Sequence, residues 1–205
     1  MAEGRVLIIA GSDSGGGAGA QADIKTVTAL GGYAASAITA VTVQNTLGVA
    51  AIHLIPADLV EAQARAVLED IGADVIKIGM VGEAVAAVIR VLDDWRETPV
   101  VVDPVMLAKD GTTLADASAV NMLRDGLLPR AALLTPNAPE AAALTGLAIQ
   151  TTDDLRRAGE ALLALGCRAV LMKGGHIPGD RVIDVLLSGD GETTFEGPRL
   201  VTRHT

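Results

Sequence analysis

Polar side chains and glycines follow six apolar, strand-like runs of this sequence. They are Gly11, Gln44, Gly79, Asp103, Asn137 and Lys173. A carboxylate can organise Mg²⁺ through water, an amide both donates and accepts hydrogen bonds, and a lysine suits a phosphate as a point charge. In parallel α/β sheets, ligands bind outside the carboxyl ends of the strands. We therefore expect these residues to share one site for a small molecule.

A glycine-rich stretch, Gly11–Gly19, holds five glycines in nine residues between an apolar run and a predicted helix. Such a loop can bring bare backbone and its N–H groups close to a ligand. It fits a dinucleotide-binding fingerprint loosely, but no acidic residue follows the second predicted strand, and no Gly-Lys-Ser/Thr follows Gly16. A plain turn between strand and helix is the other interpretation of the same residues.

Asp23 and Gln44 are candidates for contact with the ligand itself. Asp23 stands near the start of the predicted helix, where a carboxylate either binds a ligand amine or hydroxyl or interacts with the helix dipole. Gln44 offers a donor and an acceptor, which suits a flat heterocycle with a mixed edge, but it also suits an ordinary turn. The residues alone leave both alternatives open.

A second set of polar residues suits phosphate and metal chemistry. Asn137 and Glu140 have the spacing of a helix capping box, and Glu140 could instead organise Mg²⁺ and water around phosphates. Asp103 is either a turn residue or the partner of Glu140 in an acidic, metal-organising pair. Lys173 opens a glycine turn and either marks the exit of a hairpin or meets a phosphate.

The composition restricts the class of protein. Of 205 residues, 50% are hydrophobic but only one Trp, one Tyr and one Phe occur, so the core must be aliphatic. A formal charge of −9 without a basic cluster argues against a nucleic-acid partner. No apolar run approaches the roughly 18 residues of a membrane span, and we expect no membrane contact and a cytoplasmic location. The lone Cys167 suits a buried position, and we assign no role to His53 or His176.

The elements that must position these residues alternate between strand and helix. Strands are predicted at 6–10, 33–43, 49–55, 75–79, 100–102, 132–135 and 169–172, with further β structure at 182–188, 192–195 and 200–203. Helices are predicted at 20–30, from 56 to about 71, 85–95, 115–128, 139–144 and 155–165, and a loop or lid at 108–113. This alternation predicts one α/β domain over residues 1–205, with a mainly parallel central sheet flanked by helices on both faces.

Six sequence blocks occur in the order found in a known family. They are 10–19 with Gln21-Ala-Asp23, 39–46, 77–80, 102–109, 135–140 and 171–176. Over residues 6–205 the chain resembles the hydroxymethylpyrimidine/phosphomethylpyrimidine kinases of thiamine biosynthesis, which have a ribokinase-like fold. The resemblance implies that ATP, with Mg²⁺, phosphorylates 4-amino-5-hydroxymethyl-2-methylpyrimidine and then its monophosphate. It also implies a homodimer.

The same resemblance implies roles for individual residues. The positions that contact the pyrimidine in the family match Gly11, Asp23, Gln44, Met80 and Val105. The positions around the ATP phosphates match Asp103, Asn137, Glu140 and Lys173, with Asp103 and Glu140 holding Mg²⁺ through water. The glycine loop is thereby expected on the pyrimidine side of the site rather than on the phosphate side.

One motif of the family, a Gly-Thr-Gly-Cys stretch that opens a helix, would follow Thr205. The resemblance gives its amides the role of an anion hole and its cysteine that of the candidate base, so the catalytic residue stays unassigned within residues 1–205. Loss of one anion-stabilising donor costs about 10²–10³ in rate. We therefore expect the chain that ends at Thr205 to be inactive alone, its full-length parent to be a kinase, and part of the sheet to lack its covering helices.

Three other functions stay open. The nearest is a pyridoxal-type kinase of the same superfamily, although the glycine loop and 43–46 favour a pyrimidine kinase. A pyrimidine-binding module without catalysis is the second. A dinucleotide-dependent oxidoreductase is the third, and the missing acidic residue after the second strand disfavours it.

Overall fold

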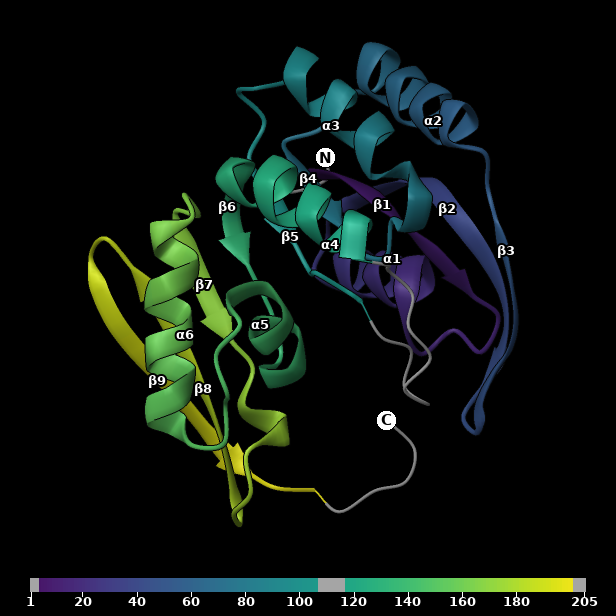
Figure 1. Ribbon diagram of the computed structural model, residues 1–205. Helices are drawn as coiled ribbons and strands as arrows, with labels where there is room; N and C mark the ends of the chain where they lie inside the picture. The colour runs from purple at the N-terminus through teal and green to yellow at the C-terminus, as the bar shows by residue number, and fades with distance from the viewer. Residues whose placement is uncertain (1–3, 107–116, 201–205) are drawn as a thin grey trace.

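The fold is built on one nine-stranded sheet, which a computed structural model describes together with its helices for residues 4–106 and 117–200 (Figure 1). The order across the sheet is β3-β2-β1-β4-β5-β6-β7-β8-β9. The strands are β1 (Arg5–Asp13), β2 (Tyr33–Asn45), β3 (Gly48–Leu54), β4 (Val75–Ile78), β5 (Val100–Val102), β6 (Ala131–Leu134), β7 (Ala169–Met172), β8 (Arg181–Ser188) and β9 (Gly191–Pro198).

The central strands of the sheet are parallel. Each neighbouring pair from β2 through β1, β4, β5 and β6 to β7 pairs in the parallel sense. The edges are antiparallel, because β3 returns along β2 while β8 and β9 follow β7 as two hairpin strands. The mainly parallel sheet predicted from the strand–helix alternation is therefore confirmed.

Helices cover the two faces of the sheet unequally. The helices are α1 (Gly19–Ala29), α2 (Ala57–Asp70), α3 (Val85–Asp94), α4 (Ala117–Met122), α5 (Ala138–Thr145) and α6 (Thr152–Ala164). Leu7 and Ile9 of β1 point into a large core beneath α2, α3, α5 and α6, whereas Ile8 points into a small core beneath α1. In Figure 1, α1 lies behind the sheet and the other helices lie in front of it or above it. Helices on both faces are thus confirmed, with α1 covering its face beside β1 and β2.

The sequence pattern explains these faces. Val60, Ala64 and Leu68 recur at intervals of four along α2, and all three are buried. Residues on β1 between Leu7 and Ala10 are all buried because core lies on both sides of this central strand. Among the described residues, no helix is long and apolar enough to cross a membrane.

The helix predicted at 115–128 is shorter in the structure, which is a correction. Helix α4 ends at Met122, a π-helical turn follows at Leu123–Leu127, and a 3₁₀ turn occupies Leu128–Arg130. Gly126 lies in the π turn, and a side chain there would clash with Ile89 of α3. The regular α-helix ends here because the chain packs closely against α3 and then reaches Pro129.

Two predicted strand ends also need correction. β1 runs on through Asp13, so the first residues of the glycine loop belong to the strand, and β2 runs on through Asn45, so Gln44 lies within it. The pairing of Ser12 with Val41 and of Asp13 with Thr42 extends β1 past its apolar run. The predicted lid at 108–113 and most of the β structure predicted at 200–203 lie outside the described residues.

Candidate active site

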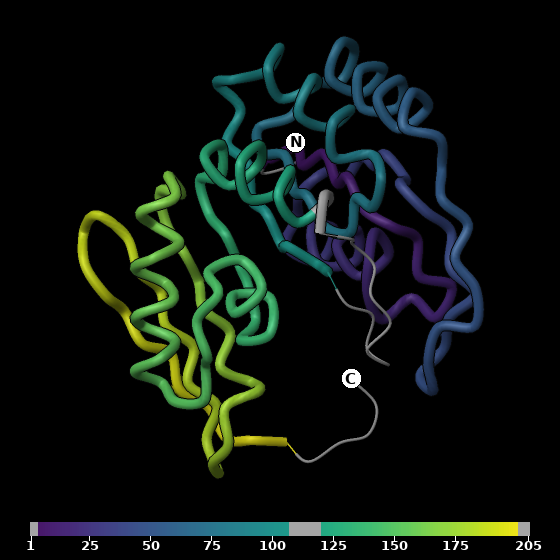
Figure 2. The backbone as a smooth tube through the Cα atoms, in the orientation of Figure 1, coloured from purple at the N-terminus to yellow at the C-terminus, as the bar shows by residue number. Residues whose placement is uncertain are grey.

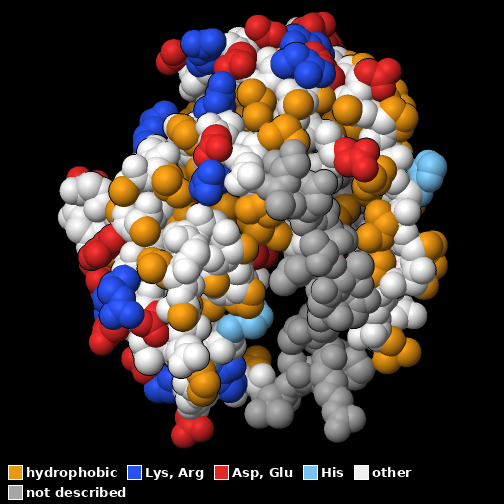
Figure 3. Space-filling view, in the orientation of Figure 1, with side chains coloured by type: hydrophobic (Ala, Val, Ile, Leu, Met, Phe, Trp, Pro, Cys, Tyr) orange, Lys and Arg blue, Asp and Glu red, His pale blue; other side chains and the backbone are white. Residues whose placement is uncertain are grey.

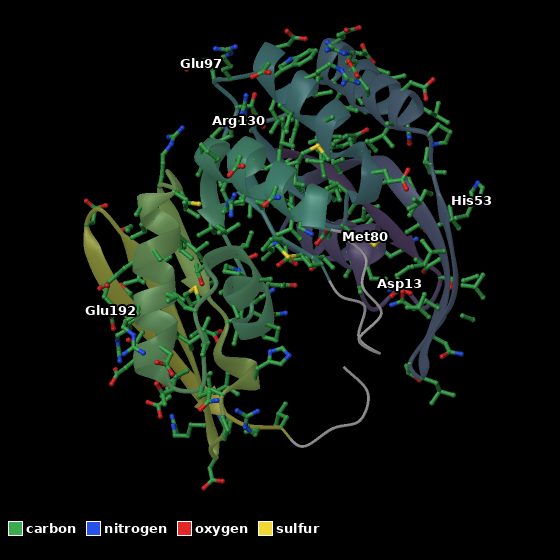
Figure 4. The ribbon with its side chains drawn as sticks, viewed as in Figure 1. Asp13, His53, Met80, Glu97, Arg130 and Glu192 are labelled. Carbon is green, nitrogen blue, oxygen red and sulfur yellow. The ribbon has the colours of Figure 1, made fainter. Side chains whose placement is uncertain are left out.

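A cavity of about 380 Å³ lies at the carboxyl ends of β1, β2, β4 and β5. All five residues expected to contact a pyrimidine line it, namely Gly11, Asp23, Gln44, Met80 and Val105. Asp103 lines it as well, whereas Asn137, Glu140 and Lys173 do not. In Figure 4, Asp13 and Met80 lie near each other at this end, far from Glu97 and Arg130 at the opposite end. Of the six residues expected to share one site, Gly11, Gln44, Gly79 and Asp103 therefore line this cavity, and Asn137 and Lys173 do not.

Two glycines let the loop pack onto the cavity wall. A Cβ at Gly11 would stand 2.5 Å from Cε of Met80, so a larger residue would push that methionine aside. Gly19 has φ +56°, and a Cβ there would clash with the carbonyl oxygen of Gly11. The glycines are therefore required by packing and backbone conformation where α1 begins.

Asp13 holds the glycine loop, and sequence reasoning missed this residue. The residue is 6% exposed, and its carboxylate accepts hydrogen bonds from the backbone N–H groups of Gly15 (2.8 Å), Gly17 (3.0 Å) and Ala18 (2.9 Å). An Asp directly before Ser-Gly-Gly is the signal that could have identified it, since Asp commonly bonds the backbone two residues on. Because these loop amides already bind a carboxylate of the chain, they are not free to cradle a phosphate.

Gln21 and Thr42 connect the loop to the neighbouring strand and helix. The Gln21 side chain accepts from the N–H of Asp13 (2.8 Å), and its amide donates to Oγ of Ser12 (2.6 Å). Thr42 is 7% exposed, and its hydroxyl, which has a single proton, lies 3.0 Å from the carbonyl oxygen of Ser12 and 3.3 Å from Oε1 of Gln44. The shorter contact uses the proton, so the amide of Gln44 can both donate and accept a hydrogen bond in the cavity.

Asp23 forms an ion pair with Lys77, at 2.6 Å between Oδ2 and Nζ. Both side chains are about one-fifth exposed and line the cavity, Asp23 from α1 and Lys77 from β4. Asp23 lies in the second turn of α1, and the first turn contains no acidic residue. The helix-dipole interpretation of Asp23 is therefore weaker than the interpretation in which it faces a ligand.

Asp103 and Lys173 meet at the next strands of the same edge. Lys173 donates from Nζ to Oδ1 of Asp103 at 2.8 Å, and Thr135 donates to the same oxygen at 3.1 Å. The three residues follow β7, β5 and β6, whose ends lie side by side in the parallel sheet. A cation and a carboxylate that sequence reasoning assigned to phosphate chemistry are thus in direct contact.

Asn137 and Glu140 form the capping box that their spacing predicts. Oδ1 of Asn137 accepts from the N–H of Glu140 at 2.9 Å, and Oε2 of Glu140 accepts from the N–H of Asn137 at 2.8 Å. Glu140 is only 5% exposed, and burial raises the pKa of its carboxyl group. The amide of Asn137 and the Lys173 cation act against this rise in pKa, while the Asp103 carboxylate adds to it.

The two carboxylates suit a magnesium ion that keeps its waters. The hydrogen bonds that described residues donate to Asp103 and Glu140 use Oδ1 and Oε2, and each group also has a second oxygen. Within residues 4–106 and 117–200, no group of three or more His, Cys, Asp and Glu side chains converges to hold a metal ion. Mg²⁺ usually binds through one or two carboxylates plus substrate phosphates, so the donor set fits metal held together with a nucleotide.

Three residues, His53, Cys167 and His176, have no assigned role. His53 is exposed on β3, and Figure 4 shows it pointing outward. Cys167 is buried, and burial raises the pKa of its thiol to about 11, so it is an inert core residue, as predicted. His176 is exposed in a 3₁₀ turn after Lys173.

The comparisons with known proteins agree on one family. The family model described as phosphomethylpyrimidine kinase matches residues 13–205. The hydroxymethylpyrimidine/phosphomethylpyrimidine kinase of Escherichia coli is 48% identical over 202 residues, which cover 97% of this chain and 76% of that protein. The thiamine biosynthesis bifunctional protein of Geobacter sulfurreducens is also 48% identical, and this chain spans 42% of its length.

Solved structures place the fold in the same group. A phosphomethylpyrimidine kinase from Clostridium difficile superposes with a TM-score of 0.85 at 44% identity, covering 93% of this chain and 83% of that one. A Bacillus subtilis pyridoxal kinase in complex with ADP gives a TM-score of 0.87 at 32% identity, covering 97% of this chain and 76% of that one. The ribokinase-like fold is confirmed, and identity is higher to the pyrimidine kinase. With the family model matching nearly the whole sequence, the chain belongs to the phosphomethylpyrimidine kinase family.

Proposed function

We propose that this chain binds 4-amino-5-hydroxymethyl-2-methylpyrimidine in the cavity at the carboxyl edge and Mg²⁺–ATP beside it. In this proposal the chain holds the substrate sites of a kinase that phosphorylates the pyrimidine and then its monophosphate for thiamine diphosphate synthesis. The observation that carries the proposal is that Gly11, Asp23, Gln44, Met80 and Val105 surround one cavity. These residues come from separate elements of the sequence, and the carboxyl ends of neighbouring parallel strands bring them to one surface.

The second half of the chain supplies the proposed nucleotide side. Figure 2 shows the first half, purple to blue, on one side of the molecule and the green-to-yellow second half on the other. Asp103 belongs to both sides, since it lines the cavity and pairs with Lys173. A γ-phosphoryl group held near Lys173 would therefore lie close to a hydroxymethyl group in the cavity. Such transfers depend mostly on positioning and on stabilising the charge of the moving group.

In this proposal no described side chain acts as the base that takes the proton of the substrate hydroxyl. We propose that Asn137, Glu140 and Lys173 orient the nucleotide and that Asp103 and Glu140 hold Mg²⁺ through water. The bound metal would neutralise phosphate charge as it develops. The chain's own contribution is to orient the hydroxymethyl group through Asp23 and Gln44 and to keep Lys173 fixed by Asp103.

The experiment that tests this function is a binding titration followed by an activity assay. Isothermal titration calorimetry should show one molecule of hydroxymethylpyrimidine bound per chain, and ADP–Mg²⁺ should bind independently. The protein should then be assayed for ATP-dependent phosphorylation. Absence of pyrimidine binding would refute the assignment of the cavity, and binding without turnover would favour a binding module.

A pyridoxal-type kinase is the second candidate, because a pyridoxal kinase superposes on this chain with a TM-score of 0.87. The two rings differ in the groups that they offer to Asp23 and Gln44, since the pyrimidine carries an exocyclic amine and pyridoxal carries a phenolic oxygen. We expect tighter binding of the pyrimidine. Tighter binding or faster turnover of pyridoxal would favour the alternative.

We also propose that the protein is a cytoplasmic homodimer. Support for self-association comes from exposed apolar side chains on the β2–β3 hairpin, where Val43 is 61% and Leu47 is 86% exposed. Figure 3 shows hydrophobic side chains along the right-hand edge, where these strands lie. Light scattering should give twice the chain mass, and a purely monomeric sample at micromolar concentration would contradict this proposal.

A further inference from the structure

Lys77 is a charged residue of the cavity to which the proposed function gives no role. It is the only cation among the described residues that line the cavity, and its Nζ stands 2.6 Å from Oδ2 of Asp23. Its side chain is 22% exposed, so most of it is shielded from water. A partly buried lysine that pairs with a carboxylate inside a cavity is a candidate for a role in ligand binding.

A glycine next to Lys77 leaves space for this ammonium group. Lys77 pairs in register with Ile8 and lies on the face that α1 covers. Gly79 follows two residues later, and a Cβ there would stand 3.1 Å from Nζ of Lys77 and 3.2 Å from Cβ of Ala10. A side chain at position 79 would therefore crowd the ammonium group against β1. The glycine keeps Lys77 over the cavity floor, within reach of Asp23.

The other charges of the cavity make the cation necessary. Three carboxylates line the cavity, at Asp13, Asp23 and Asp103. Asp13 is held by three loop amides and Asp103 by Lys173, so each has its own partner. Without Lys77, the carboxylate of Asp23 would lack a cation in a site that already carries two like charges.

We propose that Lys77 is a positioning residue for the pyrimidine, acting through Asp23. Its ammonium group donates to Oδ2 of Asp23 and so fixes the orientation of the carboxylate. No described residue donates to Oδ1, which can therefore accept a hydrogen bond from the ligand. The pair is neutral as a whole, so this part of the site favours an uncharged heterocycle with an amine or hydroxyl donor over a cationic one. The inference rests on the proposed function, because it takes the cavity to be the pyrimidine site.

A purely structural role is the competing explanation, since the pair also ties α1 to β4. Lys77→Met separates the two, because methionine keeps most of the unbranched stem beside Ile8 and removes the ammonium group with its charge and its hydrogen-bond donors. Arg5→Met is the matched control. It removes the cation of the exposed Arg5–Asp74 pair, which also ties β1 to the chain just before β4 but lies at the opposite end of the strands.

The test measures dissociation constants for hydroxymethylpyrimidine and for ADP–Mg²⁺ by calorimetry, with a thermal melt for each variant. Lys77→Met should weaken pyrimidine binding by about ten- to a hundred-fold, the usual range for losing a hydrogen bond to a charged group. ADP binding should stay within about twofold, as should both ligands with Arg5→Met. In Asp23→Asn/Lys77→Met, binding should be no weaker than in Asp23→Asn, because Lys77 acts through Asp23.

Two results would overturn the inference while leaving the proposed function intact. One is wild-type pyrimidine affinity in a folded Lys77→Met protein, and the other is full additivity of the two substitutions. If Lys77→Met does not fold, Lys77→Gln keeps a neutral donor near Asp23 and carries the same comparison. Failure of the wild-type chain to bind the pyrimidine would instead refute the proposed function, and the inference with it.

Discussion

Replacement of Asp13 tests whether an internal carboxylate shapes the pyrimidine side of the site. Its two oxygens accept three backbone N–H groups, with Gly15 on Oδ1 and both Gly17 and Ala18 on Oδ2. A hydrogen bond to a charged group contributes about 1.5–3 kcal/mol, but Gly15, Gly17 and Ala18 are exposed residues, so water can replace part of each bond once the carboxylate is removed. We expect Asp13→Ala to lower the free energy of unfolding by about 2–4 kcal/mol.

Asp13→Asn should fall between the wild type and Asp13→Ala. An asparagine side chain keeps one acceptor oxygen and loses the other, so it can hold either Gly15 or the pair Gly17 and Ala18 but not all three. Urea denaturation should therefore give a graded series, with Asn losing about half as much stability as Ala. Pyrimidine affinity should fall in the same order, because the close packing of Gly19 against Gly11 at the cavity wall is no longer held in place.

Asp154→Ala is the control for a general loss of stability. Asp154 accepts the backbone N–H groups of Gln150 (3.0 Å) and Thr151 (2.9 Å) before α6, far from the cavity in the fold. It should destabilise the protein without changing pyrimidine affinity. The reasoning would be refuted if Asp13→Ala left the pyrimidine affinity unchanged, or if it weakened ADP binding as much, because the loop would then belong to the nucleotide side.

Three further substitutions test other parts of the account. Asp23→Ala should weaken pyrimidine binding by about 1–3 kcal/mol, and unchanged affinity would return Asp23 to a purely structural role. Glu140→Gln should weaken Mg²⁺–ATP binding more than pyrimidine binding. Burial raises the pKa of Glu140, so the folded state holds the proton of this carboxyl group more tightly than the unfolded chain does. The free energy of unfolding of the wild type should therefore fall as pH rises above about 4.5. Thermal melts of Glu140→Gln at increasing pH should show less of this fall. Gly174→Ala should lower the free energy of unfolding by about 1–3 kcal/mol, because its Cβ would clash with the carbonyl oxygen of Ile183, and a wild-type melting temperature would contradict that packing.

Much of the sheet was predictable because its strands are short apolar runs between helices with clear periodicity. In α2, for example, the helical periodicity of the sequence predicts the buried positions Val60, Ala64 and Leu68. The break after α4 was not predictable, since it depends on how Gly126 meets Ile89, a contact between residues distant in the sequence. The end of β1 was missed for a similar reason, because pairing with β2 rather than local hydrophobicity carries the strand through Asp13.

The candidate site divides in the same way. Spacing predicted the capping box of Asn137 and Glu140, because both partners lie within one helical turn. The ion pairs Asp23–Lys77 and Asp103–Lys173 join residues 54 and 70 positions apart. Only the fold brings such partners together, so the sequence indicated three of these four residues as candidates without pairing them with each other, and it gave Lys77 no role.

The most direct test of the central claim is a crystal structure of the chain with hydroxymethylpyrimidine at saturating concentration. We predict the ring in the cavity bounded by Gly11, Gln44, Met80 and Val105, with one of its donors on Asp23 and its hydroxymethyl group directed toward Asp103 and Lys173. Electron density for the ligand at another place, or an empty cavity at saturation, would contradict the account.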